Sequence, residues 1–195
     1  MALPTERLKS LIEAALLVAG RPLTISDLKS TVLADYPVST RYVQLLLAEL
    51  KSDYQSRGVE LKEVASGWRI QARQEFAEEL SRLWSERAPR YSRAVMETLT
   101  LIAYRQPITR AEIEAIRGVA VSSQMVATLK ERGWVRGIGH KEAPGRPELL
   151  ATTREFLDYF NLKSLEQLPE LLPEAETPLA AALPLGGQQS GIPDE

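Results

Sequence analysis

The sequence predicts an α+β protein, mainly α-helical, in which two related domains lie in tandem and precede a disordered C-terminal tail. The main observation is a repeat. Segment 13–24, EAALLVAGRPLT, returns as segment 97–109, ETLTLIAYRQPIT, and Gln106 is the one inserted residue. Each copy is followed by patterns typical of two further helices and a β-hairpin. Because only two copies exist, the repeat indicates a domain duplication and not a solenoid.

The first copy opens with a predicted amphipathic helix. Its apolar residues follow the i, i+3, i+4 spacing of one helix face: Leu8, Leu11, Ile12, Ala15, Leu16 and Ala19. A later helix is expected over residues 39–57. Val59 and Leu61 then alternate with polar residues before a Ser66-Gly67 turn, and the alternation resumes at Trp68, Ile70 and Ala72. This pattern predicts a tight hairpin.

The second copy has clearer helix boundaries. Ser92 can cap a helix with Val95, Leu99 and Ile102 on one face. Thr109 and Glu112 have the spacing of a capping box, in which each side chain bonds the backbone N–H of the other residue. Gly118 should end that helix.

A third helix is expected from Ser122 to Gly133, with Met125, Val126 and Leu129 inward. Two strands, 134–138 and 149–152, then flank the turn Pro144-Gly145-Arg146-Pro147. A second capping box, starting at Thr152, should open a closing helix with Phe156 and Phe160 on one face. Three short helices with a hairpin behind the third describe a winged helix-turn-helix.

The expected organisation is a first winged-helix domain over residues 1–86, a linker over 87–91 and a second winged-helix domain over 92–168. The tail, 169–195, contains five prolines and acidic but no basic residues. Such a composition buries too little apolar surface to offset the entropy of ordering the chain, so disorder is expected.

Composition argues against an enzyme. The chain has no Cys, which excludes a Cys nucleophile, and only one His, which excludes a two-His metal site. That residue, His140, lies in the predicted hairpin turn, which argues against a Ser-His-Asp triad. We therefore predict no catalytic, cofactor-binding or metal-binding residues. The apolar run 11–18 contains Glu13 and is far shorter than a membrane span, so we expect a cytoplasmic protein.

DNA binding is the natural alternative for winged helices. The third helix of the first copy carries Arg41, Lys51 and Arg57 against Glu49 and Asp53, which leaves little net positive charge. The second hairpin is more basic, with Arg132, Arg136, Lys141 and Arg146 against Glu142. Several cations are needed for tight binding to phosphates, so only weak or indirect DNA contact is expected.

Three segments carry a family resemblance. They are LIAYRQPITRAEIEAIRGV at 101–119, KEAPGRP at 141–147 and TTREFLDYFNLKSL at 152–165. Together they closely resemble the segregation and condensation protein B family, and the resemblance extends from about residue 8 to 168. It implies a non-enzymatic subunit of the bacterial condensin-like complex. Such subunits form homodimers, largely through the first domain, and bind the kleisin, segregation and condensation protein A, which closes a ring on the structural-maintenance-of-chromosomes (SMC) ATPase.

The implied function is chromosome condensation and segregation at cell division, in a nucleoid-associated protein. Two other hypotheses stay open: a dimeric winged-helix transcription regulator, and a tRNA- or nucleotide-modifying protein that uses its winged helices for recruitment. The candidate dimer residues are Leu16, Leu17 and Val18. The candidate kleisin-binding residues are Arg110, Arg117 and Arg146, because guanidinium groups suit carboxylates on a partner.

We predict that ending the chain after Leu168 leaves the melting temperature nearly unchanged, because the composition of the tail predicts no packed structure. Thermal unfolding followed by circular dichroism checks this. A drop of several degrees, the size expected from about 1 kcal/mol in a domain of this size, would show instead that the tail docks on the protein.

Overall fold

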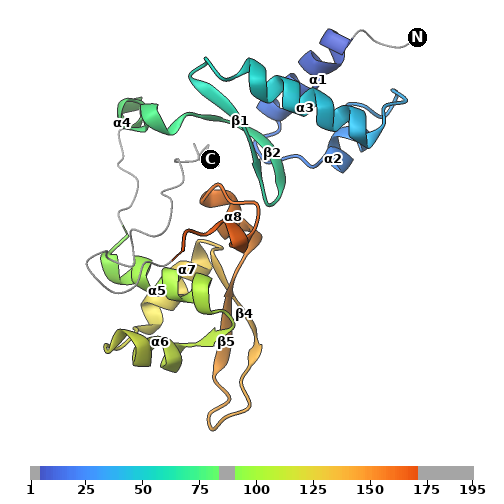
Figure 1. Cartoon of the computed structure of the whole chain (residues 1–195). Helices are drawn as coiled ribbons and strands as arrows, with labels where there is room; N and C mark the ends of the chain where they lie inside the picture. The colour runs from blue at the N-terminus through green and yellow to red at the C-terminus, as the bar shows by residue number, and fades with distance from the viewer. Residues whose placement is uncertain (1–4, 84–90, 171–195) are drawn as a thin grey trace, which may run out of the picture. The chain divides into compact units, whose positions relative to one another are not determined.

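The computed structural model describes residues 5–83 and 91–170, and these form two compact units (Figure 1). We call residues 5–83 module 1 and residues 91–170 module 2. Each contains three helices followed by an antiparallel hairpin. The predicted fold class, a mainly helical α+β protein with two winged-helix modules, is confirmed. Apart from Tyr91, Pro169 and Glu170, the predicted linker and tail lie outside the described residues.

Module 1 has its core between three helices and one face of a two-stranded sheet. Its elements are α1 (Thr5–Val18), α2 (Ile25–Ser30), α3 (Thr40–Asp53), β1 (Val59–Val64), β2 (Gly67–Ala72) and a short α4 (Ala77–Leu80). The hairpin turn is Ala65-Ser66, one residue earlier than predicted, because Gly67 already pairs with Val64. A side chain at Gly67 would lie 2.4 Å from the Leu23 carbonyl, so only glycine fits beside the segment that leads into α2.

Module 2 follows the same plan and adds a strand. Its elements are α5 (Arg93–Arg105), β3 (Ile108–Thr109), α6 (Arg110–Arg117), α7 (Ser123–Glu131), β4 (Val135–His140), β5 (Glu148–Thr152) and α8 (Arg154–Tyr159). The sheet order is β3-β5-β4, with Ile108 opposite Leu150. Strand β3 was not predicted, because two residues are too short to show an alternating pattern.

The predicted caps of module 2 are mostly confirmed. Ser92 and Ser122 accept the expected backbone N–H bonds, Thr109 and Glu112 form a complete capping box, and Gly118 ends α6 with φ 70°. The box predicted at Thr152 is wrong. The N-terminal cap of α8 is Thr153, whose hydroxyl accepts the Phe156 N–H. Thr152 is the last residue of β5, and both its N–H and its hydroxyl donate to the Gln106 side chain.

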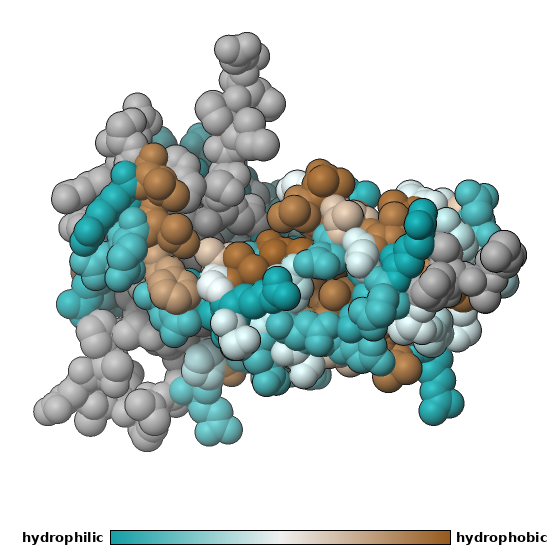
Figure 2. All heavy atoms as spheres, turned by 90° about the horizontal axis from the view of Figure 1, so that it is seen from above, coloured by the Kyte–Doolittle hydropathy of each residue, from teal (hydrophilic) through white to brown (hydrophobic). Residues whose placement is uncertain are grey.

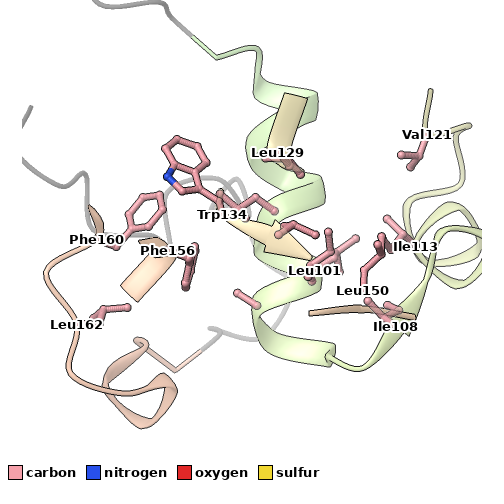
Figure 3. Close-up of a cluster of buried hydrophobic side chains, with 14 residues drawn as sticks. Leu101, Ile108, Ile113, Val121, Leu129, Trp134, Leu150, Phe156, Phe160 and Leu162 are labelled. Carbon is pink, nitrogen blue, oxygen red and sulfur yellow. The ribbon is translucent and has the colours of Figure 1, made fainter. Parts of the chain in front are cut away.

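Aromatic rings close the core of module 2 (Figure 3). Trp134, at the start of the hairpin, lies 4.6 Å from the Tyr159 ring and 5.6 Å from the Phe160 ring, between ring centroids. The ring of Tyr91 is 5.0 Å from Trp134, so this residue of the predicted linker belongs to module 2. The contacts also extend into the predicted tail, since the Tyr104 hydroxyl donates to the Pro169 carbonyl.

One carboxylate joins α6 to the hairpin of module 2. Glu112 accepts bonds from the Thr109 N–H and hydroxyl, both at 2.8 Å, and from the Lys141 ammonium at 2.5 Å. These bonds, first that of Lys141, lower the pKa of Glu112 to about 2. A carboxylate whose pKa is depressed by folding stabilises the protein above the pKa of the unfolded state, and that stability is lost as pH falls.

We therefore predict that Glu112→Gln removes part of the acid sensitivity of the fold between about pH 4.5, the usual glutamate value, and about pH 2. Urea unfolding at pH 7, 4.5 and 3 measures this. The variant should be less stable than the parent at pH 7, and the difference should shrink as pH falls. Glu142→Gln, at an exposed carboxylate without a described partner, is the control. A constant difference across the three pH values would contradict the prediction.

Candidate partner-binding surfaces

The predicted dimer residues have different surroundings at the end of α1. Leu16 is only 4% exposed and lies in the core of module 1, whereas Leu17 and Val18 are 69% and 81% exposed. The prediction of Leu16 as an interface residue does not fit this burial, because Leu16 shares its helix face with Ile12. Leu17 and Val18 remain as an apolar pair at the surface.

The duplication makes this exposure informative. By the offset of 84 residues, Leu17 and Val18 correspond to Leu101 and Ile102 of α5, which are 5% and 0% exposed. Helix α5 packs against α6, α7 and β5, and its residues 98–103 are all buried. The same face that module 2 buries within its own fold is therefore open in module 1.

A groove of about 370 Å³ runs along α7 in module 2. Its walls come from the start of α6, from α7 and from the segment that enters β5. The lining residues are Arg110, Ser123, Val126, Ala127, Lys130, Pro147, Glu148 and Leu150. Val126, Ala127 and Leu150 are apolar members of this lining, and Arg110, Lys130 and Glu148 are its charged members. Such a site suits an apolar segment that also carries acidic groups.

Arg110 is the only one of the three predicted arginines that lines this groove. Its Nε lies 3.1 Å from a Glu114 carboxylate oxygen, and its Nη1 donates to the Ser123 hydroxyl at 2.9 Å. The Glu114 carboxylate also accepts the Val121 N–H, and these bonds lower the pKa of Glu114. The guanidinium is therefore held in place, while its Nη2 makes no hydrogen bond within the described residues.

Arg117 lies in the interior. Its side chain is 9% exposed, and Nη2 contacts a Glu97 carboxylate oxygen at 3.1 Å, which joins α6 to α5. Arg93 also donates to Glu97, and both arginines lower the pKa of that carboxyl, Arg93 more strongly. The sequence held a signal for this burial: Arg117 follows the fully buried Ile113 by four residues and so shares its helix face.

Arg146 lies at the tip of the hairpin, next to Pro147 but outside the lining of the groove. Its backbone N–H donates to the Ala143 carbonyl at 2.8 Å, and its φ is 39°. Its side chain is exposed and makes no hydrogen bond or ion pair within residues 5–83 and 91–170. The structure thus places the three predicted arginines in three different environments.

Other surface features went unpredicted. In the groove, Lys130 contacts Glu148 at 2.7 Å, and Ser123, Val126, Ala127 and Lys130 share one face of α7 through their i, i+3, i+4, i+7 spacing. Large apolar side chains also reach the surface elsewhere, and Figure 2 shows apolar patches among hydrophilic side chains. They include Leu45 on α3 and the pair Ile116 and Val119 beside Gly118.

The described ranges offer neither a membrane-spanning helix nor a metal-binding cluster. No helix in residues 5–83 and 91–170 is long and apolar enough to cross a membrane. The same residues contain no group of three or more His, Cys, Asp or Glu side chains that could hold a metal ion.

Comparison with known proteins gives consistent matches. The family model "Segregation and condensation complex subunit ScpB" matches residues 10–171. A segregation and condensation protein B homolog from Coxiella burnetii is 53% identical over 163 residues, which cover 84% of this chain and 78% of the relative. Segregation and condensation protein B from Symbiobacterium thermophilum is 45% identical over 163 residues, covering 83% of this chain and 72% of the relative.

Two solved structures are similar as well. ScpB from Mycobacterium tuberculosis is 32% identical, with a TM-score of 0.38, covering 83% of this chain and 99% of that one. A dimer of the ScpB N-terminal domain complexed with ScpA peptide is 25% identical, with a TM-score of 0.36, covering 43% of this chain and 95% of that one. The family model and the sequence relatives span both modules, and the motifs at 101–119, 141–147 and 152–165 predicted the same family. This chain belongs to the ScpB family of segregation and condensation complex subunits.

Proposed function

We propose that this chain is a non-enzymatic, nucleoid-associated subunit of a bacterial condensin-like complex in the cytoplasm. It forms a homodimer and binds the kleisin ScpA, through which it reaches the SMC ATPase and supports chromosome condensation and segregation. The observation that carries the proposal is membership of the ScpB family over residues 10–171, which include both modules. The surfaces described above agree with it, because an open apolar helix face and a groove both suit protein partners.

The exposed pair at the end of α1 supports dimerisation through module 1. A second copy that covers Leu17 and Val18 would bury the face that α5 buries within module 2. Full burial of a leucine or valine side chain contributes about 1.5–3 kcal/mol, so a symmetric interface gains from each residue twice.

We predict that Leu17→Asp together with Val18→Asp converts the dimer to a monomer, because each substitution places a charge in an apolar interface. Sedimentation equilibrium at tens of micromolar protein measures the mass, and circular dichroism checks that the fold persists. Leu45→Asp, at an exposed leucine on α3, is the matched control and should leave the dimer intact. A parent protein that is monomeric at this concentration would contradict the prediction.

The groove of module 2 is the surface that we assign to ScpA. Its apolar side chains can contact the apolar side of a kleisin segment, and the fixed Arg110 guanidinium can donate its remaining N–H groups to a carboxylate. The candidate anchors are thereby narrowed to Arg110, since Arg117 is buried and Arg146 lies outside the groove.

We predict that Arg110→Ala weakens binding of ScpA about 30-fold or more, which corresponds to the roughly 2 kcal/mol typical of an interface hot spot. Calorimetric titration of the full chain with ScpA measures the affinity. Arg105→Ala, at an exposed arginine of α5, is the matched control and should bind like the parent.

Arg117→Ala serves as a second comparison. It removes a buried partner of Glu97, so it should lower the melting temperature, with a loss of stability of about 3 kcal/mol, and leave the affinity of the folded protein for ScpA close to that of the parent. An unchanged affinity in Arg110→Ala, with a lowered affinity in Arg117→Ala at a temperature where it is folded, would place the ScpA site elsewhere.

A further inference from the structure

The hairpin of module 2 carries positive charge that the fold leaves unbalanced. We call β4, β5 and the turn between them the wing. Two of the ammonium groups at the wing are neutralised internally, since Lys130 pairs with Glu148 at 2.7 Å and Lys141 pairs with Glu112 at 2.5 Å. Those pairs use the carboxylates of Glu148 and Glu112, which are then not available to the other cations of the wing.

Arg136 and Arg146 are not neutralised in this way. Both side chains are exposed, and neither makes a hydrogen bond or ion pair in the part of the chain that the structure describes. The guanidinium carbon of Arg132, just before the wing, lies 5.5 Å from the Tyr91 ring centroid. This cation–π contact does not neutralise the positive charge of Arg132. Within the wing, Arg136 and Arg146 stand against Glu142 in the turn, so the wing has a net positive charge, to which the adjacent Arg132 adds.

The backbone of Arg146 adds an independent argument. Its φ of 39° lies in the left-handed region, where a non-glycine residue costs roughly 1 kcal/mol. A glycine would relieve this cost, as Gly145 does one residue earlier with φ 81°. No described intramolecular contact of the Arg146 side chain offsets the cost, so the fold itself gives no reason for arginine here.

The shape of the wing narrows the choice of partner. In Figure 1 the β4–β5 ribbon projects beyond the helices of module 2, and Arg136 to His140 are exposed along β4. The strand between Arg136 and the turn has about five residues and a length of roughly 16 Å, which is the length of about five base pairs of duplex DNA. A narrow ribbon with arginines along its length fits a DNA groove, where guanidinium groups meet closely spaced phosphates.

We propose that the wing of module 2 binds the backbone of duplex DNA without reading its sequence, and that Arg136 and Arg146 make the phosphate contacts. Arg136 and Arg146 lie outside the lining of the ScpA groove, although the groove and the wing share Pro147, Glu148 and Leu150. The binding energy at the wing is electrostatic. Few cations take part, and the chain has a net charge of −2, so the affinity is low and falls steeply with salt.

The test uses the full chain and a fluorescently labelled duplex of about 25 base pairs, with anisotropy measured from about 50 to 200 mM salt. The single variants are Arg146→Gly and Arg136→Gln, and the third variant combines them. Each single substitution should reduce the slope of log affinity against log salt by about 1, and the double variant should bind at least tenfold more weakly at about 50 mM salt. Arg41→Gln, at an exposed arginine of α3 in module 1, removes the same charge and should change nothing.

Arg146→Gly also separates binding from folding, because glycine is favoured at this φ: the variant should melt at or above the temperature of the parent. The proposal is overturned if the parent does not bind duplex at about 50 mM salt, or if the double variant binds like the parent. It is equally overturned if Arg136→Gln and Arg146→Gly weaken ScpA capture and leave DNA binding unchanged, since the wing would then be part of the kleisin site.

Discussion

The carboxylate of Glu112 connects the two candidate sites of module 2. Through the Thr109 N–H and hydroxyl it fixes the first turn of α6, and α6 begins at Arg110, one wall of the groove. Through the Lys141 ammonium it holds the far end of β4 against that same turn. The residue that caps α6 thus also contacts the wing, 29 residues away in the sequence.

The duplication places the same fold in two different surroundings. Both modules start α2 or α6 with a capping box, Thr24 with Asp27 in module 1 and Thr109 with Glu112 in module 2. They differ in what surrounds the first helix. Helix α5 is buried on several faces by its own module, whereas α1 leaves Leu17 and Val18 in solvent. An apolar face that is not covered by its own chain is a natural surface for a second copy.

Arginine residues in one short stretch of sequence have three unlike roles. Arg110 is oriented by Glu114 and Ser123 at a groove, Arg117 is buried against Glu97, and Arg146 is exposed in a left-handed turn. What separates them is the position of the nearest carboxylate. Arg117 is buried with its glutamate, Arg110 is oriented by Glu114 but keeps Nη2 without a described partner, and Arg146 has no described side-chain partner.

The sequence alone determined the duplication, the order of the main helices and hairpins, most caps and the family. These depend on local spacing: helical periodicity, a hydroxyl three residues before its partner, or a glycine where φ must be positive. Helical spacing even held the signal for the burial of Leu16 and Arg117, next to Ile12 and Ile113 on their faces. Only the tertiary structure decided that Leu17 and Val18 are exposed while Leu101 and Ile102 are buried, and that Thr152 belongs to β5. It also decided that Lys130 and Lys141 form ion pairs while Arg136 and Arg146 form none within the described residues. Each of these findings depends on contacts between residues far apart in the chain. A local sequence pattern does not predict which distant side chain will contact a given residue.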